Sequence, residues 1–339
     1  MVDMAMQKKL TLLAALALIG SVYAVLVRYT KSTAKLNYIS STVVAMQELL
    51  KMFMTSMVLC HESGGLGPAM QLLHHHIIRS PLDTAKLAVP SFLYALQNNM
   101  FFLSLSNMDA PTQQVLLELK IPFTALLCVF LLGRKLSVQQ WLSIFLMFAG
   151  TGLIEYYSAA DTKSAVNSDQ PVPIASNENF MVGLFAVVVG SLCSAIAGVY
   201  FEKIIKTNDT SLWIRNFQLY VWSVPISFIA SFINDWRKIK ENGFFSGYNH
   251  LIWCLIFLSA FSGLIISIVL LYSNNITKCF ATSLSIILST IASFYLFNYH
   301  IGWYFICGTS LVCCSIFFYT VPLKCQSTKE PPAEHLASP

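Results

Sequence analysis

The sequence places a few charged residues inside or at the ends of long apolar stretches, where they could bind a charged ligand. Lys120 lies about midway along one stretch, and Lys278 lies at the start of another. Two ammonium groups could bind one phosphate, and a helix N-terminus at Lys278 would strengthen that attraction. A lysine in an apolar span otherwise requires an acidic partner, for which Glu48 and Glu118 are the internal candidates. Both interpretations stay open.

A second group of residues offers hydrogen bonds. Gln97, Asn98 and Asn99 are consecutive carboxamides, so at least one must face protein or a cavity when they lie on a helix. Asn216 and Tyr220 are four residues apart and share a helix face. A Tyr and an amide suit a nucleobase, which is recognised by stacking and by hydrogen bonds at its edge, but Tyr is also common at membrane interfaces.

Small residues mark two further helix faces. Gly190, Ser194 and Gly198 follow one another at four-residue spacing, which allows a helix or a ligand to approach the backbone closely. Helix packing is the simpler interpretation of that face. Ser285 and Ser289 are also four apart and are the candidates for lining a polar path, although a hydroxyl can equally bond its own helix backbone.

Spacing also predicts which charged residues pair. Glu48 and Lys51 are three apart, so we expect an internal ion pair. Gln113 can share a broad face with Lys120, whereas Glu118 and Lys120 are two apart and are not expected to face each other on a continuous helix.

Several functional classes lack support in the sequence. It shows no nucleophile–base pair, metal-ligand cluster or glycine-rich phosphate loop, so we expect neither an enzyme nor a cofactor or metal. The net charge of +5 is spread over several segments, which does not indicate a nucleic-acid partner.

The composition indicates where these residues lie. Only 11% of the 339 residues are charged and 56% are hydrophobic, whereas a soluble domain is roughly a quarter charged. We therefore expect an all-α protein in the lipid bilayer with about ten transmembrane helices, because stretches of about 17–23 apolar residues can cross it. The predicted spans are 10–26, 38–60, 87–105, 112–132, 140–156, 180–200, 212–232, 251–272, 280–297 and 301–321.

The spans divide into two halves around the polar stretch 158–179. An odd number of spans in each half predicts opposite orientations, as in transporters built from inverted repeats. We therefore expect an N-terminal half (1–157), a lumenal linker (158–179), a C-terminal half (180–322) and a disordered cytosolic tail (323–339). A second charged loop is expected at 235–249. Lys and Arg are more frequent in loops on the side of the N-terminus, which predicts that both termini are cytosolic.

Five strings in the sequence closely resemble nucleotide-sugar transporters of the CMP-sialic acid, UDP-galactose and UDP-N-acetylglucosamine branch: LQNN (96–99), AIAGVYFEK (195–203), LWIRNFQLY (212–220), GFFSGYN (243–249) and FATSLSIILST (280–290). The resemblance implies the ten-helix drug/metabolite-transporter fold. It also implies that a Golgi membrane protein exchanges a cytosolic nucleotide sugar for a lumenal nucleoside monophosphate.

The resemblance assigns roles to individual residues. Lys120 and Lys278 match phosphate-contacting lysines. The matches to positions in the nucleotide pocket are Gln97, Asn98, Ser194, Gly198, Asn216 and Tyr220. The chain departs from the family pattern at Gln113, Leu117, Glu118, Leu271 and Cys279.

The expected substrate is a UDP-sugar, carrying N-acetylglucosamine, galactose or N-acetylgalactosamine, in exchange for UMP. The sugar is expected near Gln97 and Gln113. The alternatives are a CMP-sialic acid/CMP exchanger and a non-transporting member that acts as a membrane partner. Possible protein partners are a second copy of the chain, other Golgi transporters and glycosyltransferases.

Overall fold

The computed structural model describes residues 2–30, 37–105, 107–108, 110–166, 179–207, 210–297 and 302–320, and the regular elements in these ranges are all helices. The described part of the chain is therefore all-α, as predicted. The helices are α1 (Val2–Arg28), α2 (Ser40–Glu62), α3 (Leu66–His74), η2 (His75–Arg79), α4 (Pro81–Lys86), α5 (Ala88–Leu105), α6 (Ala110–Leu117), α7 (Lys120–Leu132), α8 (Val138–Val166), α9 (Phe180–Thr207), α10 (Leu212–Asn242), α11 (His250–Tyr272), α12 (Asn275–Phe297) and α13 (Trp303–Thr320).

Many of these helices are suited to lipid. Seven segments are long and apolar enough to cross a membrane: Gln7–Arg28, Ser40–Glu62, Val115–Leu132, Phe180–Thr207, Leu212–Asn242, His250–Tyr272 and Asn275–Leu296. Two shorter apolar helices are Val138–Ile154 and Trp303–Tyr319. Such helices can cross lipid because they satisfy their own backbone hydrogen bonds. With several of them in one chain, the protein is a multi-pass membrane protein.

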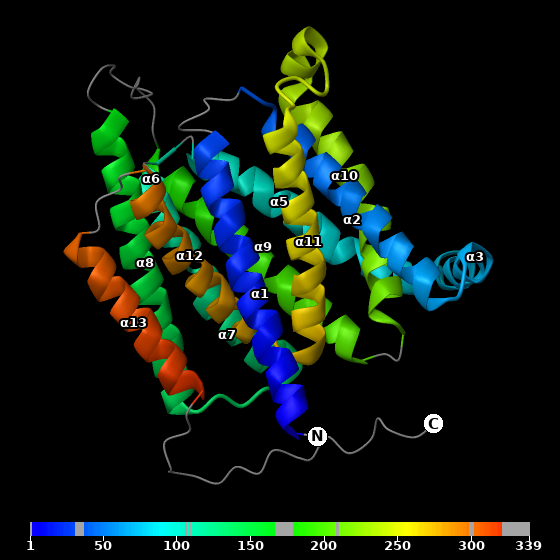
Figure 1. The fold of residues 1–339 in the computed structure, drawn as a ribbon, viewed down its shortest axis with the longest axis horizontal. Coiled ribbons are helices and arrows are strands. Elements are labelled where there is room, and N and C mark those ends of the chain that lie inside the picture. The colour runs from blue at the N-terminus through cyan, green and yellow to red at the C-terminus, as the bar shows by residue number, and fades with distance from the viewer. Residues whose placement is uncertain are drawn as a thin grey trace.

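The two parts of the chain on either side of 158–179 are packed into one bundle. Helix α5 lies along α9, α2 along α10, α8 along α13, and α1 along both α11 and α12 (Figure 1). A large core cluster joins α7, α8, α9 and α12, with members such as Ile121, Met147, Val199 and Phe280. Each part therefore buries its apolar side chains largely against the other.

Two predicted loops are shorter than expected. Helix α8 continues to Val166, and residues 167–178 lie outside the described ranges, as does the predicted tail 323–339. Helix α10 continues to Asn242 with one non-helical residue, Asp235 (φ −124°, ψ 23°), so the prediction of a loop from 235 was wrong. Hydropathy marks the apolar part of a helix, whereas helical hydrogen bonding continues into polar sequence.

The predicted span 112–132 is not one helix. Helix α6 ends at Leu117 and α7 begins at Lys120, with a tighter turn between them in which Leu119 N donates to Leu116 O (3.0 Å). Pro122 explains the break, because it has no N–H to donate to the Glu118 carbonyl four residues earlier. Ile121 N donates to Glu118 O instead (2.9 Å).

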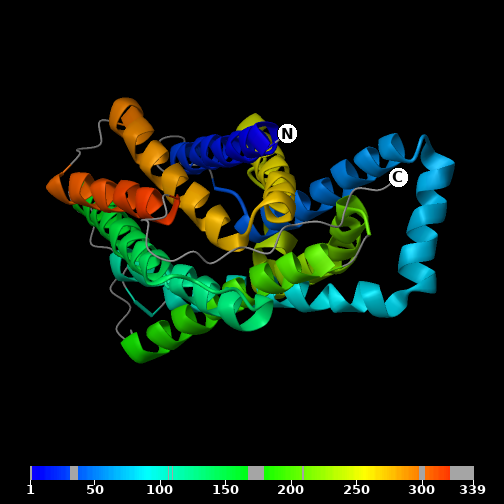
Figure 2. The ribbon, with the colours of Figure 1, turned by 90° about the horizontal axis from the view of Figure 1, so that it is seen from below.

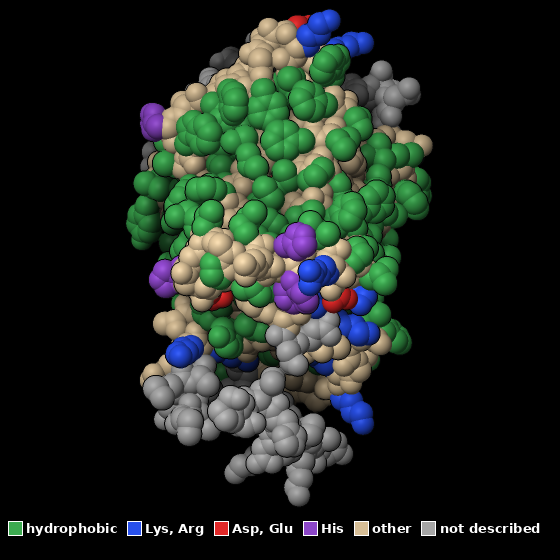
Figure 3. All heavy atoms as spheres, turned by 90° about the vertical axis from the view of Figure 1, so that its right-hand side faces the viewer, with side chains coloured by type: hydrophobic (Ala, Val, Ile, Leu, Met, Phe, Trp, Pro, Cys, Tyr) green, Lys and Arg blue, Asp and Glu red, His purple; other side chains and the backbone are tan. Residues whose placement is uncertain are grey.

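Helices α3, η2 and α4 form a peripheral elbow (66–86) between α2 and α5. Helix α3 crosses the direction of its neighbours at the edge of the bundle (Figure 2). That side of the molecule shows a broad apolar face with histidine, lysine and arginine side chains along its lower edge (Figure 3). The Lys86 hydrogen bond holds the pKa of Asp83 below its usual range, so Asp83 stays charged 3.8 Å from buried Arg215.

Buried and partly buried hydrogen bonds attach this elbow to α10. Gln218 Nε2 donates to His76 O (3.0 Å) and Thr84 Oγ1 (3.1 Å), and Trp222 Nε1 donates to Thr84 O (2.9 Å). The N-terminal end of α10 is thereby fixed. The same helix carries the predicted residues Asn216 and Tyr220, about one and two turns after its first residue, Leu212.

Candidate functional site

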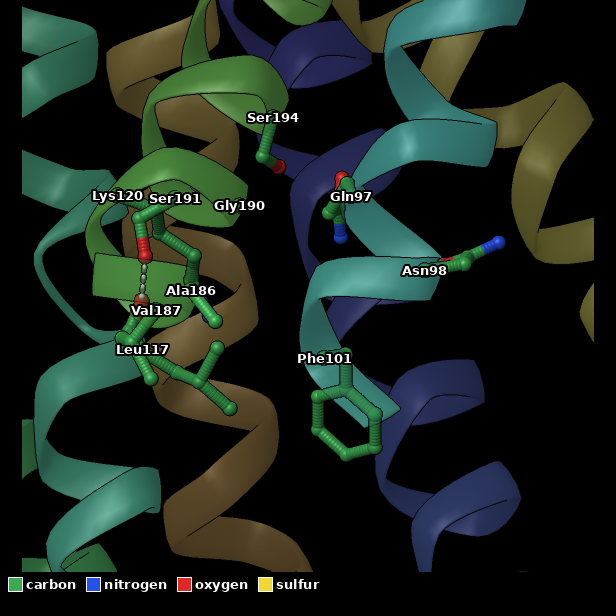
Figure 4. Close-up of a pocket in the computed structure, with 10 residues that line it drawn as sticks. All are labelled: Gln97, Asn98, Phe101, Leu117, Lys120, Ala186, Val187, Gly190, Ser191 and Ser194. Carbon is green, nitrogen blue, oxygen red and sulfur yellow. Dashed lines mark hydrogen bonds between the residues drawn. The ribbon is translucent and has the colours of Figure 1, made fainter. Parts of the chain in front are cut away.

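A cavity lined by both polar and apolar residues lies between α5, α9 and the break that separates α6 from α7. Its volume is about 330 Å³, close to the lower end of the range of roughly 300–1,000 Å³ typical of ligand pockets. Its lining residues, drawn in Figure 4, are Gln97, Asn98, Phe101, Leu117, Lys120, Ala186, Val187, Gly190, Ser191 and Ser194. Four of the ten predicted site residues are among them: Lys120, Gln97, Asn98 and Ser194.

Small residues of α9 make room for this cavity and bring α5 close. A Cβ added to Gly190 would lie 3.2 Å from Met100 Cβ and 3.7 Å from Gln97 O. Ser191 Oγ reaches the Leu117 carbonyl at 3.5 Å, which connects α9 to the end of α6 (Figure 4). The predicted small face thus serves helix packing and also forms a cavity wall.

The three carboxamides of α5 have different surroundings. The Gln97 side chain points into the space between α5 and α9, and its buried Oε1 has no hydrogen-bond partner among the described residues (Figure 4). The Asn98 side chain is exposed and its amide end points away from α9. Asn99 Nδ2 donates to Ala95 O (2.9 Å). Gln97 therefore presents the acceptor that a donor on a ligand could satisfy, because an unpaired buried carbonyl is unfavourable.

Lys120 is paired with an acid at the cavity wall. Its Nζ lies 3.0 Å from Glu118 Oε1, and the Glu118 side chain is only 5% exposed. The expectation that these residues do not face each other was wrong, because it assumed a continuous helix and the helix is broken between them. The expected pair of Glu48 and Lys51 is present, with Nζ and Oε1 2.6 Å apart.

Lys278 lies in the first turn of α12, where Asn274 Oδ1 accepts from Thr277 N (2.7 Å). It does not line the cavity, but its ammonium group is close enough to that of Lys120 for the two to repel each other. Cations on α7 and α12, one from each part of the chain, therefore act on the same region. An anion between them would relieve the repulsion.

Asn216 and Tyr220 are buried on α10, away from the cavity lining. Asn216 has no exposed surface, and neither atom of its amide has a partner among the described residues. Tyr220 is 3% exposed and lies in the neighbourhood of Glu48 and Tyr94. These residues form a second polar region beside α2 and α5, separate from the cavity in this conformation.

Comparison with known proteins identifies the family. The family model for nucleotide-sugar transporters matches residues 4–320. This chain belongs to the nucleotide-sugar transporter family. The resemblance predicted from the sequence is thereby confirmed.

Relatives of this nucleotide-sugar transporter include UDP-N-acetylglucosamine transporters from Mus musculus (42% identical) and Homo sapiens (41% identical), each over 284 residues that cover 83% of this chain and 85% of the relative. A UDP-galactose translocator from Bos taurus is 37% identical over 297 residues, covering 87% of this chain and 73% of the relative. A solved crystal structure with 10% identity superposes with a TM-score of 0.64 over 93% of this chain and 97% of its own. That likeness concerns the fold alone.

Three predicted site residues of this nucleotide-sugar transporter make contacts within the protein instead of lining the cavity. Gln113 Nε2 donates to Phe101 O (2.9 Å) and Ser104 Oγ (2.5 Å), so it fixes α6 to α5. A Cβ on Gly198 would lie 2.6 Å from Asn275 Nδ2, and a Cβ on Gly20 would lie 2.6 Å from Ser285 Oγ. Gly198 and Ser285 thus lie at close contacts between helices.

The sequence analysis missed Glu202, which is fully buried on α9. Its Oε1 accepts from Arg134 Nη2 and Lys206 Nζ, both at 2.8 Å, and its Oε2 accepts from Asn275 N at 2.8 Å. Lys206 also donates to the Ser273 carbonyl. One carboxylate therefore joins α9, the α7–α8 connection and the start of α12. An acid followed by a lysine four residues later was the available signal, but such a pair usually lies on a solvated helix face.

Proposed function

We propose that the protein is a UDP-sugar antiporter of the Golgi membrane, importing a UDP-sugar in exchange for UMP. The observation that carries the proposal is a cavity lined by both Lys120 and Gln97, whose side-chain carbonyl has no partner among the described residues. The chain that forms this cavity is a member of the nucleotide-sugar transporter family. The relatives named for UDP-N-acetylglucosamine are 41–42% identical and those named for UDP-galactose 37%, which favours N-acetylglucosamine as the sugar.

The proposed binding mode assigns each polar region to a part of the substrate. Lys120 and Lys278 bind the phosphates, because a phosphate accepts charge-assisted hydrogen bonds from ammonium groups. Gln97 is near the sugar, and Ser194 borders the same space. The nucleoside is contacted by Asn98, Asn216 and Tyr220. This requires α5 and α10 to move, because Asn98 points away from α9 and the other two residues do not line the cavity.

The proposed architecture is ten transmembrane helices in two inverted halves. In this proposal the helices of the first half, α1, α2, α5, α7 and α8, correspond in that order to those of the second half, α9, α10, α11, α12 and α13. When each helix is replaced by its counterpart, the α5–α9 contact becomes the α11–α1 contact. The α7–α9 contact likewise becomes the α12–α1 contact, and both members of each pair are found. The contacts α2–α10 and α8–α13 map onto themselves. This pattern supports a two-fold relation between inverted repeats.

Alternating access then requires one side of the bundle to open while the other closes. We assign the Glu202 network to closure of the side at which α1 begins, because it connects the α7–α8, α9 and α11–α12 segments there (Figure 1). Both termini are cytosolic in this proposal, so the network closes the cytosolic side. Opening that side requires Arg134, Lys206 or Asn275 to leave the carboxylate.

The first test is exchange by purified protein in liposomes loaded with UMP, with radiolabelled UDP-N-acetylglucosamine outside. We expect uptake that depends on internal UMP, and we expect Lys120→Ala to lower it about 10- to 100-fold, the cost of losing one or more hydrogen bonds to a charged group. The matched control is Lys135→Ala, which removes an exposed lysine and should leave uptake unchanged.

Equal uptake by Lys120→Ala and the unaltered protein would contradict the phosphate role. Absence of uptake with every nucleotide sugar, from folded protein, would favour the second candidate function, a non-transporting membrane partner of other transporters or glycosyltransferases. One observation supports that candidate: Lys120 already has an acidic partner in the protein itself.

A further inference from the structure

The ion pair of Glu118 and Lys120 places a negative charge inside the region proposed to bind phosphate. Leu117 and Lys120, the residues on either side of the helix break, both line the cavity. Glu118 lies between them, and its carboxylate oxygen is 3.0 Å from Lys120 Nζ. The Glu118 side chain is 5% exposed and the Lys120 side chain 37%, so the acid is held in the protein while the lysine remains partly open to the cavity.

The helix break makes this geometry possible. On a continuous helix, side chains two residues apart point in clearly different directions. The turn at Glu118 and Leu119, caused by the missing N–H of Pro122, brings the carboxylate to the lysine. The pair is therefore a consequence of the local backbone, which α9 supports through the contact of Ser191 with the Leu117 carbonyl.

The charges in the region explain what the acid does. The ammonium groups of Lys120 and Lys278 lie close enough to repel each other, and Glu118 and Cys279 lie in the same neighbourhood. Two positive charges without an anion would be unfavourable in apolar surroundings. Glu118 supplies one negative charge to this region, at the position where it contacts Lys120 directly.

We propose that Glu118 is a resident counter-ion that occupies Lys120 in the empty protein and is displaced by the phosphate of the ligand. The inference deepens the proposed function and rests on it in one respect, the identity of the ligand as a nucleotide. A ligand with two phosphate groups displaces the carboxylate better than one with a single phosphate, because it offers more charge and more acceptor oxygens to the two lysines. Glu118 is thus a specificity-determining residue that lowers the affinity for all nucleotides and lowers the affinity for monophosphates most.

The test measures binding of UMP and UDP to protein in phosphatidylcholine nanodiscs by calorimetry. We expect Glu118→Gln, which keeps the size and polarity of the side chain, to bind UMP about five- to tenfold more tightly, the effect of removing the ionic competitor of a partly exposed lysine. We expect the ratio of UDP affinity to UMP affinity to fall in the same variant, a change that a merely structural role would not cause.

Two controls separate the ion pair from other effects. In a Lys120→Gln background, Glu118→Gln should raise UMP affinity by clearly less than in the unaltered protein, because no ion pair remains to be displaced and only the repulsion between carboxylate and phosphate is removed. Glu241→Gln alters net charge equally at an exposed position at the far end of α10 and should have no effect. If Glu118→Gln does not fold, Glu118→Asp serves instead, because the shorter carboxylate withdraws from Lys120 and should give an intermediate gain in affinity.

Each outcome is decisive. Tighter UMP binding by Glu118→Gln supports the inference, even where binding to the unaltered protein is too weak to measure. If the unaltered protein binds UMP and Glu118→Gln binds it equally or less tightly, the inference is overturned while the proposed function stands. If no folded variant binds any nucleotide, both are overturned.

Discussion

Asn216 has an amide that is fully buried and has no partner among the described residues. A buried amide without a hydrogen bond costs about 1–3 kcal/mol, so a position of this kind is retained where another state supplies the partner. A nucleoside edge offers both a donor and an acceptor and would satisfy the amide. Tyr220, one turn further along α10, would then contact the same group.

We therefore expect Asn216→Leu to lower UMP affinity without lowering stability. Leucine has the same branched shape as asparagine and removes two polar atoms from a buried position, so the thermal midpoint should stay equal or rise, while the stabilisation by added UMP disappears. Thermal unfolding with and without UMP measures both effects. A variant that keeps the full UMP response would show that Asn216 does not contact the nucleoside.

At the scale of residues, the sequence predicted which polar side chains lie at the cavity better than it predicted how those side chains are oriented and paired. Gln97 and Lys120 could be selected because a polar group in an apolar stretch is costly, and both line the cavity. Glu118 was one of the two acids named as a partner for Lys120, but the spacing rule argued against their contact because it presumes a continuous helix. Pro122 was visible in the sequence, but a proline in a span can bend a helix or end it, and only the packing of α6 and α7 decides which.

At the scale of elements, Glu202 holds three segments together at one end of the bundle. We expect Glu202→Gln to loosen this end, because the variant leaves Arg134 and Lys206 without their anion and weakens the bond to Asn275 N. Cys128 and Cys279 are buried nearby, and Glu202 acts electrostatically on Cys128.

The measurement is the rate at which a membrane-impermeant maleimide labels Cys128 and Cys279 from the cytosolic side. The rate should rise several-fold in Glu202→Gln and stay unchanged in Lys135→Gln, an exposed neighbour of Arg134. Identical labelling rates in all three proteins would argue against a closing role for Glu202.

The positions of the elements were mostly predictable, whereas their ends were not. Apolar stretches located the seven long apolar helices of the described residues, because a membrane span needs about 20 consecutive apolar residues. The ends of α8 and α10 were misjudged because both helices continue into polar sequence. The elbow lies between the predicted spans 38–60 and 87–105, and its hydrogen bonds to Gln218 and Trp222 come from a distant part of the chain.

At the scale of the whole molecule, α8 and α13 form one of the two contacts that map onto themselves in the proposed exchange of the halves. Gly150 and Gly308 lie at its centre: a Cβ on Gly150 would lie 2.8 Å from Gly308 O, and a Cβ on Gly308 would lie 2.7 Å from Gly150 O. The two helices therefore touch backbone to backbone. The sequence could suggest two halves by counting spans, but a contact between single glycines so far apart required the structure.

We expect Gly150→Ala to lower the free energy of unfolding by about 1–3 kcal/mol, because an added methyl group collides with the carbonyl and the side chains of α13. Gly152→Ala in the same helix is the matched control, since its Cβ would lie 3.4 Å from Val115 Cγ1, an ordinary contact. Thermal unfolding in nanodiscs compares them. Equal midpoints for the two variants would contradict the close packing.

The Gly150–Gly308 contact also bears on how the molecule can move. Where two helices are in contact through their backbones, no layer of side chains separates them and they cannot slide past each other. We therefore expect α8 and α13 to move as one rigid body throughout a transport cycle. Rearrangement is then left to helices separated by side chains and cavities, among them α5, α7, α9 and α12. We expect a crosslink between α8 and α13 at this contact to leave turnover intact, because it joins two helices that do not move relative to each other.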